Sequence, residues 1–138
     1  MICNANITIV NRKRDSGRNE VLMPTVIKHV AWHSSNDATG GNSVSSHDVV
    51  KVRIPIDADF GEKTYVPRVV YDAMSVEEAK GYWTLAERDI VVRGEVTEEE
   101  VTQTKLAEQF PELFLINSYS DNTDLGTDAI KHWRVGGS

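Results

Sequence analysis

Two histidines in the sequence have a spacing that can serve metal binding. His29 and His33 are four residues apart within "TVIKHVAWH". On a helix this spacing would place both imidazoles on one face, but the segment alternates like a β-strand, in which residues four apart are separated by about 13 Å. A tetrahedral ion needs three or more ligands that converge. We therefore predict ordinary strand histidines here, and no metal site.

Two aspartates have the spacing of a catalytic carboxylate pair. Asp57 and Asp59, in "IDADFG", would lie on one face of an extended chain, as acid and base roles require. No aromatic subsite or third polar group frames the pair in the sequence, so we interpret it as part of a solvated loop. The enzyme alternative is a small metal-dependent hydrolase that uses His29, His33 and one of the two aspartates. Stoichiometric zinc or manganese in purified protein would favour it.

The other signatures of chemistry are incomplete. Residues 120–128, "SDNTDLGTD", resemble a calcium-binding loop but have Thr123 and Leu125 at ligand positions, so they predict a polar hairpin loop. No serine lies in a nucleophile elbow, and no glycine-rich loop has the lysine and hydroxyl of a phosphate-binding loop. We predict no enzyme activity, no cofactor and no metal. The tryptophans follow strand patterns and are predicted to anchor the core or a subunit interface: Trp32, Trp83 and Trp133.

The composition is that of one globular domain. The chain has 138 residues, a net charge of −6 and one cysteine, Cys3, so an intrachain disulfide is excluded. The first ten residues, "MICNANITIV", lack the pattern of a signal peptide, and no apolar run approaches the roughly 20 residues that span a bilayer. We expect a single β-barrel-like domain over residues 1–138, without secretion or membrane insertion.

Alternating apolar residues predict short β-strands along most of the chain. The predicted strands are residues 5–12, 25–33, 48–56, 82–85, 90–96, 112–120 and 130–135. Helical spacing predicts short helices over 65–74, 75–81 and 101–110. Few long helical crossovers separate the strands. The predicted fold is therefore mainly β (α+β): a small antiparallel β-barrel or sandwich of six or seven strands with two or three short helical insertions.

The alternation also predicts which side chains share a face. In the second strand, Val26, Val30 and Trp32 are predicted on one face and Ile27 on the other. This assignment assumes an uninterrupted alternation along the strand.

In the strand that begins at Ile90, Val92 and Val96 share the face of Ile90, whereas Glu95 points outward. Gly94 falls on the apolar side of this alternation, which is typical of a bulge or of a close approach of another chain segment.

Turn and capping residues mark the ends of the elements. Residues 14–19, "RDSGRN", predict a turn, in which Gly17 is able to take a positive φ. Ser75 with Glu78 forms a capping box before a short helix, and Thr97 with Glu100 forms a second one before the next helix.

Charge is distributed unevenly along the chain. Residues 1–35 carry five bases against two acids, whereas residues 77–112 carry ten acids against four bases. If these segments fold onto different faces, identical copies can meet head to tail with opposite charges in contact, a geometry that builds rings. The basic stretch "NRKR" is too short for tight phosphate binding, so we predict no sequence-specific nucleic-acid partner.

One polar segment is unusually long. Residues 34–46, "SSNDATGGNSVSS", are thirteen residues with only Ala38 and Val44 apolar. A loop of this length within a compact domain tends to be functional or disordered.

Several motifs together resemble a known group of proteins. With "NANITIVNR", "TVIKHVAWH", "VRIPIDADFGEKTYV", "YWTLAERDIVVRGEVT" and "HWRVGG", the chain resembles a family of short prophage-encoded proteins of unknown function from Firmicutes, over nearly its whole length. These proteins look like products of the head and tail assembly region of tailed phages. Their size and strand pattern are similar to head-tail connector proteins of the stopper or head-completion type, which form rings of small β-barrels below the portal.

The resemblance implies a structural virion protein whose partners are portal or adaptor proteins, tail components and copies of itself. It implies assembly in the host cytoplasm, then a place in the virion, with an isolated subunit that can be monomeric. A tail terminator or another minor capsid or tail protein is the alternative. The long loop would reorder on assembly. The predicted partner contacts are Arg12, Lys13, Arg14, Asn36, Thr39, Gly40, Gly41, Ser43, Glu98, Glu99 and Glu100.

Overall fold

Six strands of the computed structural model close into a barrel. The structure describes residues 3–15, 17–34, 50–96, 102–110, 112–123 and 131–137. The barrel strands are β1 (Ala5–Arg14), β2 (Glu20–Ser34), β3 (Val50–Pro55), β6 (Ile90–Arg93), β7 (Leu113–Asn122) and β8 (His132–Gly137). They pair in the order β1-β2-β3-β8-β7-β6, and every pair, including the closing pair of β6 with β1, is antiparallel. The prediction of a mainly β fold is confirmed. Of the two architectures considered, a barrel and a sandwich, the structure has the barrel.

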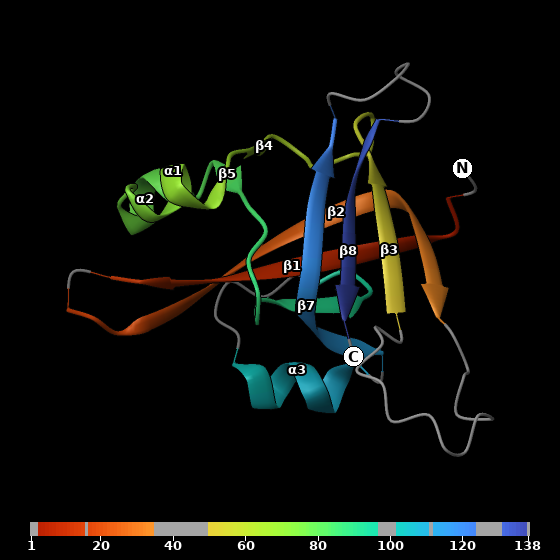
Figure 1. The fold of residues 1–138 in the computed structure, drawn as a ribbon. Helices are drawn as coiled ribbons and strands as arrows, with labels where there is room; N and C mark the ends of the chain where they lie inside the picture. The colour runs from red at the N-terminus through yellow and green to blue at the C-terminus, as the bar shows by residue number, and fades with distance from the viewer. Residues whose placement is uncertain are drawn as a thin grey trace.

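The first two strands form a hairpin that is longer than the barrel. β1 pairs with β2 along its whole length, from Ala5 to Arg14, but with β6 only from Ile7 to Val10. β2 pairs with β3 only from Ala31 onward. The end of the hairpin, residues 11–24, therefore projects from the barrel as a two-stranded ribbon, which Figure 1 shows in red and orange. We call this segment the ribbon.

The turn of the ribbon is fixed by an aspartate. The Asp15 carboxylate accepts hydrogen bonds from the backbone amides of Gly17 and Asn19, each at 2.9 Å. The residue with positive φ is Arg18, at 63°. The predicted turn is present, but its left-handed residue is Arg18 and not Gly17, because the Asp15 bonds place it one position later.

A β-bulge in β2 changes the predicted facing of its side chains. Ala5 pairs with Val30 and Ile7 pairs with Ile27, so β2 has one extra residue between the two pairs, and His29 there has a φ of 67°. As a result Ile27, Val30 and Trp32 all lie in the main core. The prediction that Ile27 faces away from Val30 is therefore wrong. β2 also begins five residues before the predicted start at 25 and contains Pro24.

The barrel interior forms the main core. The alternation of β3 is confirmed, since Val52 and Ile54 are buried inside and Lys51 and Arg53 are exposed. All three tryptophans are buried, which confirms the core alternative for them. Trp83 and Trp133 lie 5.1 Å apart between ring centroids, and Phe60 and Tyr65 pack against both rings.

The helix α3 (Gln103–Gln109) covers the outside of the barrel near β1, β6 and β7 (Figure 1). Its N-cap is Thr102, whose side chain accepts from the amide of Lys105. A second core lies between α3 and the barrel strands, formed by Val10, Ile90, Val92, Val96 and Leu106. The predicted facing of the β6 strand is confirmed by this list, while the capping box predicted at 97–100 lies outside the described residues.

Gly94 lies where β6 ends. Its φ is 140°, and a Cβ there would come within 2.8 Å of the Phe110 ring. The predicted close approach at this glycine is confirmed. The ring can pack against the backbone only because no side chain separates them.

The helices α1 (Arg68–Asp72) and α2 (Val76–Ala79) form an insertion beside the ribbon, next to the short parallel strands β4 (Thr64–Tyr65) and β5 (Tyr82–Trp83). Ser75 caps α2 by accepting from the amide of Glu78 at 3.2 Å, as predicted. A third, small core joins this insertion to β2, and its buried members are Met23, Tyr71 and Ala79.

Candidate functional site

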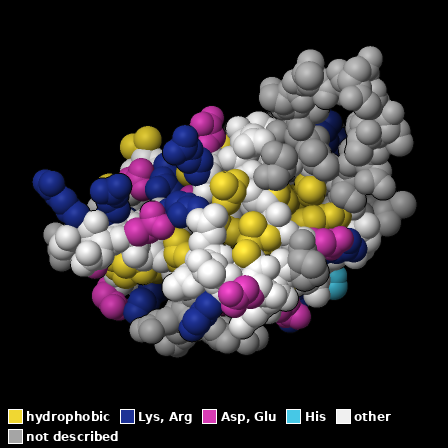
Figure 2. Space-filling view, turned by 90° about the horizontal axis from the view of Figure 1, so that it is seen from below, with side chains coloured by type: hydrophobic (Ala, Val, Ile, Leu, Met, Phe, Trp, Pro, Cys, Tyr) yellow, Lys and Arg dark blue, Asp and Glu magenta, His cyan; other side chains and the backbone are white. Residues whose placement is uncertain are grey.

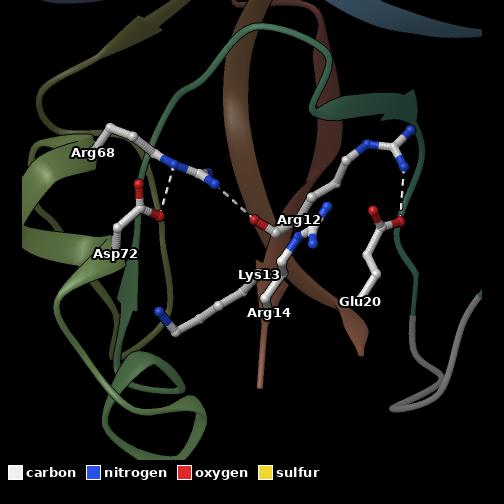
Figure 3. Close-up of a pocket in the computed structure, with 6 residues that line it drawn as sticks. All are labelled: Arg12, Lys13, Arg14, Glu20, Arg68 and Asp72. Atoms are coloured by element: carbon white, nitrogen blue, oxygen red, sulfur yellow. Dashed lines mark hydrogen bonds and ion pairs between the residues drawn. The ribbon is translucent and has the colours of Figure 1, made fainter. Parts of the chain in front are cut away.

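A cleft of about 350 Å³ lies between the ribbon and α1. Six side chains line it, from β1, β2 and α1: Arg12, Lys13, Arg14, Glu20, Arg68 and Asp72. Figure 3 shows these side chains around the cleft, and Figure 2 shows Lys and Arg side chains gathered on the side of the molecule from which the ribbon projects. We call this site the basic cleft. It joins three of the predicted partner-contact residues to three residues that were not predicted.

Lys13 lies in the interior, although it was predicted as a partner contact. Only 4% of the residue is exposed. Its ammonium donates to the backbone oxygen of Tyr71 at 2.9 Å and lies 5.0 Å from the centroid of the Tyr71 ring. The cation is thus held between a carbonyl dipole and the face of an aromatic ring, both of which favour positive charge.

Arg12 is held by three different elements. Its Nη1 donates to Glu20 of β2 at 2.9 Å, and its Nη2 donates to Gln103 of α3 at 2.8 Å. Its Nε donates to the backbone oxygen of Arg88 at 2.9 Å. All three nitrogens of the guanidinium are engaged, so the Arg12 side chain forms a fixed wall of the basic cleft.

Arg68 links the helical insertion to the ribbon. Its Nε contacts Asp72 at 2.9 Å, and its Nη2 donates to the backbone oxygen of Arg12 at 2.8 Å. Its Nη1 contacts Asp89 at 3.3 Å. Because these acceptors lie on α1, on β1 and in the turn before β6, Arg68 fixes the position of α1 against the barrel.

Asp89 lies behind the basic cleft, at the end of the turn before β6. It is 1% exposed and accepts from Asn11 Nδ2 at 2.9 Å and from the Arg12 amide at 3.2 Å, in addition to Arg68. Burial raises the pKa of Asp89 to about 6, against the opposing effects of the Asn11 hydrogen bond and the Arg68 charge. Asn11 is fixed in turn, since its Nδ2 also donates to the Thr84 oxygen and its Oδ1 accepts from the Thr84 amide.

Tyr71 belongs to the third core, and its ring contacts two cations that line the basic cleft, Lys13 and Arg68. The residue is fully buried, and its hydroxyl has no hydrogen-bond partner among the described residues. Burial raises the pKa of Tyr71 well above its ordinary value, so the phenol stays neutral. The Lys13 ammonium lies over the face of the Tyr71 ring, and the Arg68 guanidinium carbon lies 5.8 Å from the ring centroid.

Arg14 differs from the other cations of the basic cleft. It is exposed, and within the described part of the chain no hydrogen bond or ion pair holds its guanidinium. The cleft therefore combines three fixed cations, one free cation and two carboxylates on its rim. This arrangement can bind an oxyanion through Arg14 with little rearrangement of the walls.

The other predicted residues fall into two groups. Asn36, Thr39, Gly40, Gly41, Ser43, Glu98, Glu99 and Glu100 lie outside the described residues. His29, His33, Asp57 and Asp59 are exposed. Across the described ranges, no three His, Cys, Asp or Glu side chains gather as metal ligands.

Sequence reasoning missed Arg68, Asp72 and Asp89. Arg68 and Asp72 have the i, i+4 spacing of a helical ion pair, which is a common surface feature and carries little information. Asp89 directly precedes the apolar run "IVV". An acidic residue at this place indicates the end of a turn, and only the fold shows that its carboxylate is buried.

In the described residues, no helix is long and apolar enough to cross a membrane. Neither a curated protein nor a solved structure matches the chain. A family model does match, over residues 2–138, and its description is a family of unknown function (DUF6751). Because the match extends over nearly the whole sequence, the chain belongs to this family.

Proposed function

We propose that the protein is a non-enzymatic structural component of a phage or prophage virion. In this proposal it is a head-tail connector subunit, of the stopper or head-completion type, and identical copies form a ring between the portal and the tail. The resemblance noted in the sequence motivates the proposal. The closed barrel with helical insertions is compatible with it, because it is the architecture that the resemblance implies.

The observation that carries the proposal is the projecting ribbon. Residues 12–20 of the ribbon carry four bases and two acids, whereas the rest of the chain carries eleven bases and nineteen acids. A basic arm on an acidic body favours contacts in which the arm of one copy meets the body of the next. Such heterologous contacts close into a ring when the rotation between copies permits it.

The ribbon is also held rigidly enough to dock. Arg12 binds β2 and α3, and Arg68 binds the backbone of the ribbon. Pre-organisation of this kind reduces the entropy lost on association, so modest contacts suffice for assembly on a template. Modest contacts with a small entropy loss are consistent with a subunit that is monomeric in isolation and forms a ring on a template.

Cryo-electron microscopy of the cognate particle tests the proposal. We expect a ring of barrel-shaped density between the portal and the tail. Absence of the protein from assembled particles would refute the proposal. Deletion of the gene separates the two structural alternatives: filled heads without tails that leak DNA indicate a stopper, whereas heads that keep their DNA beside unjoined tails indicate a tail terminator.

A matched pair of variants tests the role of the ribbon in the assembly. Arg18 lies in the exposed ribbon turn, whereas Arg53 is exposed on β3, opposite Ala31 of β2 and thus beyond the part of β2 that belongs to the ribbon. We expect Arg18→Glu to abolish the higher-mass complex of the protein with its portal at low salt, and Arg53→Glu to retain it. Equal loss in both variants would show that net charge alone governs association, and retention in both would exclude the ribbon as a docking arm.

A further inference from the structure

We propose that the basic cleft binds carboxylate side chains from an acidic segment of a partner protein, with Arg14 as the group that pairs with them. This inference goes beyond the function proposed above, since it assigns a site and a ligand chemistry that do not depend on where the protein acts. It rests on the geometry of the cleft and on the charge of the rest of the chain.

The walls of the basic cleft are fixed before any ligand arrives. The three guanidinium nitrogens of Arg12 and the three of Arg68 are engaged with acceptors of the protein. These two side chains therefore supply positive potential without being free to move. A site whose charges are already oriented loses little entropy when an anion binds.

Two cations retain unused hydrogen-bond donors. The Arg14 guanidinium has no hydrogen-bond or ion-pair partner within the described residues, and this planar group can form two parallel bonds to a carboxylate. For the Lys13 ammonium, the described residues supply one acceptor, the Tyr71 oxygen, so two of its N–H groups remain. Figure 3 shows no interaction of either residue with another lining side chain.

The size of the cleft restricts the ligand. A volume of about 350 Å³ is at the lower end of the range of ligand sites, which is about 300 to 1,000 Å³. Glu20 and Asp72 at its rim would repel a dense polyanion but leave room for one or two carboxylates. The eleven bases and nineteen acids of the chain outside residues 12–20 also disfavour an extended nucleic-acid contact. An acidic protein segment therefore fits the small cleft and the acidic charge of the rest of the chain better than a nucleic acid does.

Titration of the full chain with a blocked hexaglutamate peptide, followed by NMR and calorimetry at low salt, tests this inference. We expect saturable binding that shifts the amide signals of residues 12–14 and 68–72. Arg14→Gln is expected to weaken the affinity about fivefold, since an exposed ion pair contributes up to about a factor of five. The matched control Arg53→Gln removes the same charge from exposed β3 and is expected to leave the affinity within about twofold.

The competing outcomes are distinct. Absence of saturable binding, or equal weakening by Arg14→Gln and Arg53→Gln, would overturn the assignment of the site. Inorganic phosphate that displaces the peptide at equal concentration would show a phosphate site in place of a carboxylate site. Tighter binding of a short DNA duplex than of the peptide, with the same shifted amides, would show a nucleic-acid contact and likewise overturn the proposal. None of these results depends on whether the protein is found in a virion.

Discussion

The wild-type protein should gain stability on acidification through the Asp89 carboxylate, and replacement of Asp89 by asparagine should remove this gain. In the folded protein the pKa of Asp89 is about 6, and the ordinary value is 3.8. Between these two values the folded state binds a proton that the unfolded state does not bind. Stability therefore increases as the pH falls through about 6. The stabilisation from protonation of Asp89 is fully present only below the ordinary pKa of 3.8.

The magnitude follows from the two pKa values. Their difference corresponds to about 3 kcal/mol, because one pKa unit is about 1.4 kcal/mol. At pH 4 the unfolded carboxyl is itself partly protonated, so the gain between pH 7 and pH 4 is about 2 kcal/mol. Other groups titrate over the same range, and for this reason the quantity to compare is the difference between the wild-type protein and Asp89→Asn.

Urea unfolding at several pH values between 7 and 4 measures this difference. Relative to Asp89→Asn, the wild-type midpoint should rise by about 1 to 2 M urea over this range. NMR titration of the Asp89 carboxyl should give a midpoint near 6. A constant difference would mean that Arg68 and Asn11 cancel the effect of burial, and a wild-type protein that loses stability relative to the variant on acidification would mean that they outweigh it; either result would refute the reasoning.

Three further predictions concern packing. Gly94→Ala should destabilise the protein by about 1 to 3 kcal/mol, because its φ of 140° is strained for alanine and the new Cβ would meet the Phe110 ring; thermal unfolding measures the loss. Gly137→Ala should be more severe, since its Cβ would overlap a backbone oxygen of β7, and circular dichroism should show loss of the native fold at 25 °C. Val92→Asp should cost several kcal/mol, as a buried carboxylate without a partner, whereas Glu95→Ala should stay within about 1 kcal/mol; equal denaturant midpoints would show that the strand facing is misassigned.

The sequence predicted the elements whose signals are local. The alternation of Val52 and Ile54 with exposed Lys51 and Arg53, and the cap of α2 at Ser75, follow from neighbouring residues alone. The second strand was harder. Its bulge at His29 depends on pairing with β1, and a shift of one residue reverses every side chain that follows.

The candidate site was predictable only in part. The stretch "NRKR" indicated a charged contact, and Arg12 and Arg14 do line the basic cleft. The burial of Lys13 depends on Tyr71, which is 58 residues away in the sequence, and that of Asp89 depends on Asn11, 78 residues away. Such contacts follow from the closure of the barrel and the docking of the insertion, and no pattern within one segment contains them.

The ribbon leaves the barrel with two open edges, yet its backbone is poorly suited to accept another strand. On the β1 edge, the amide and the oxygen of Arg12 are occupied by Asp89 and Arg68. On the β2 edge, Pro24 has no N–H group and its oxygen accepts from Lys63; beyond the ribbon on the same strand, both backbone groups of Lys28 pair with Asp59. Such blocked edges protect a projecting hairpin from uncontrolled strand addition and aggregation. At these positions a neighbour that docks on the ribbon must therefore recognise side chains instead of extending the sheet.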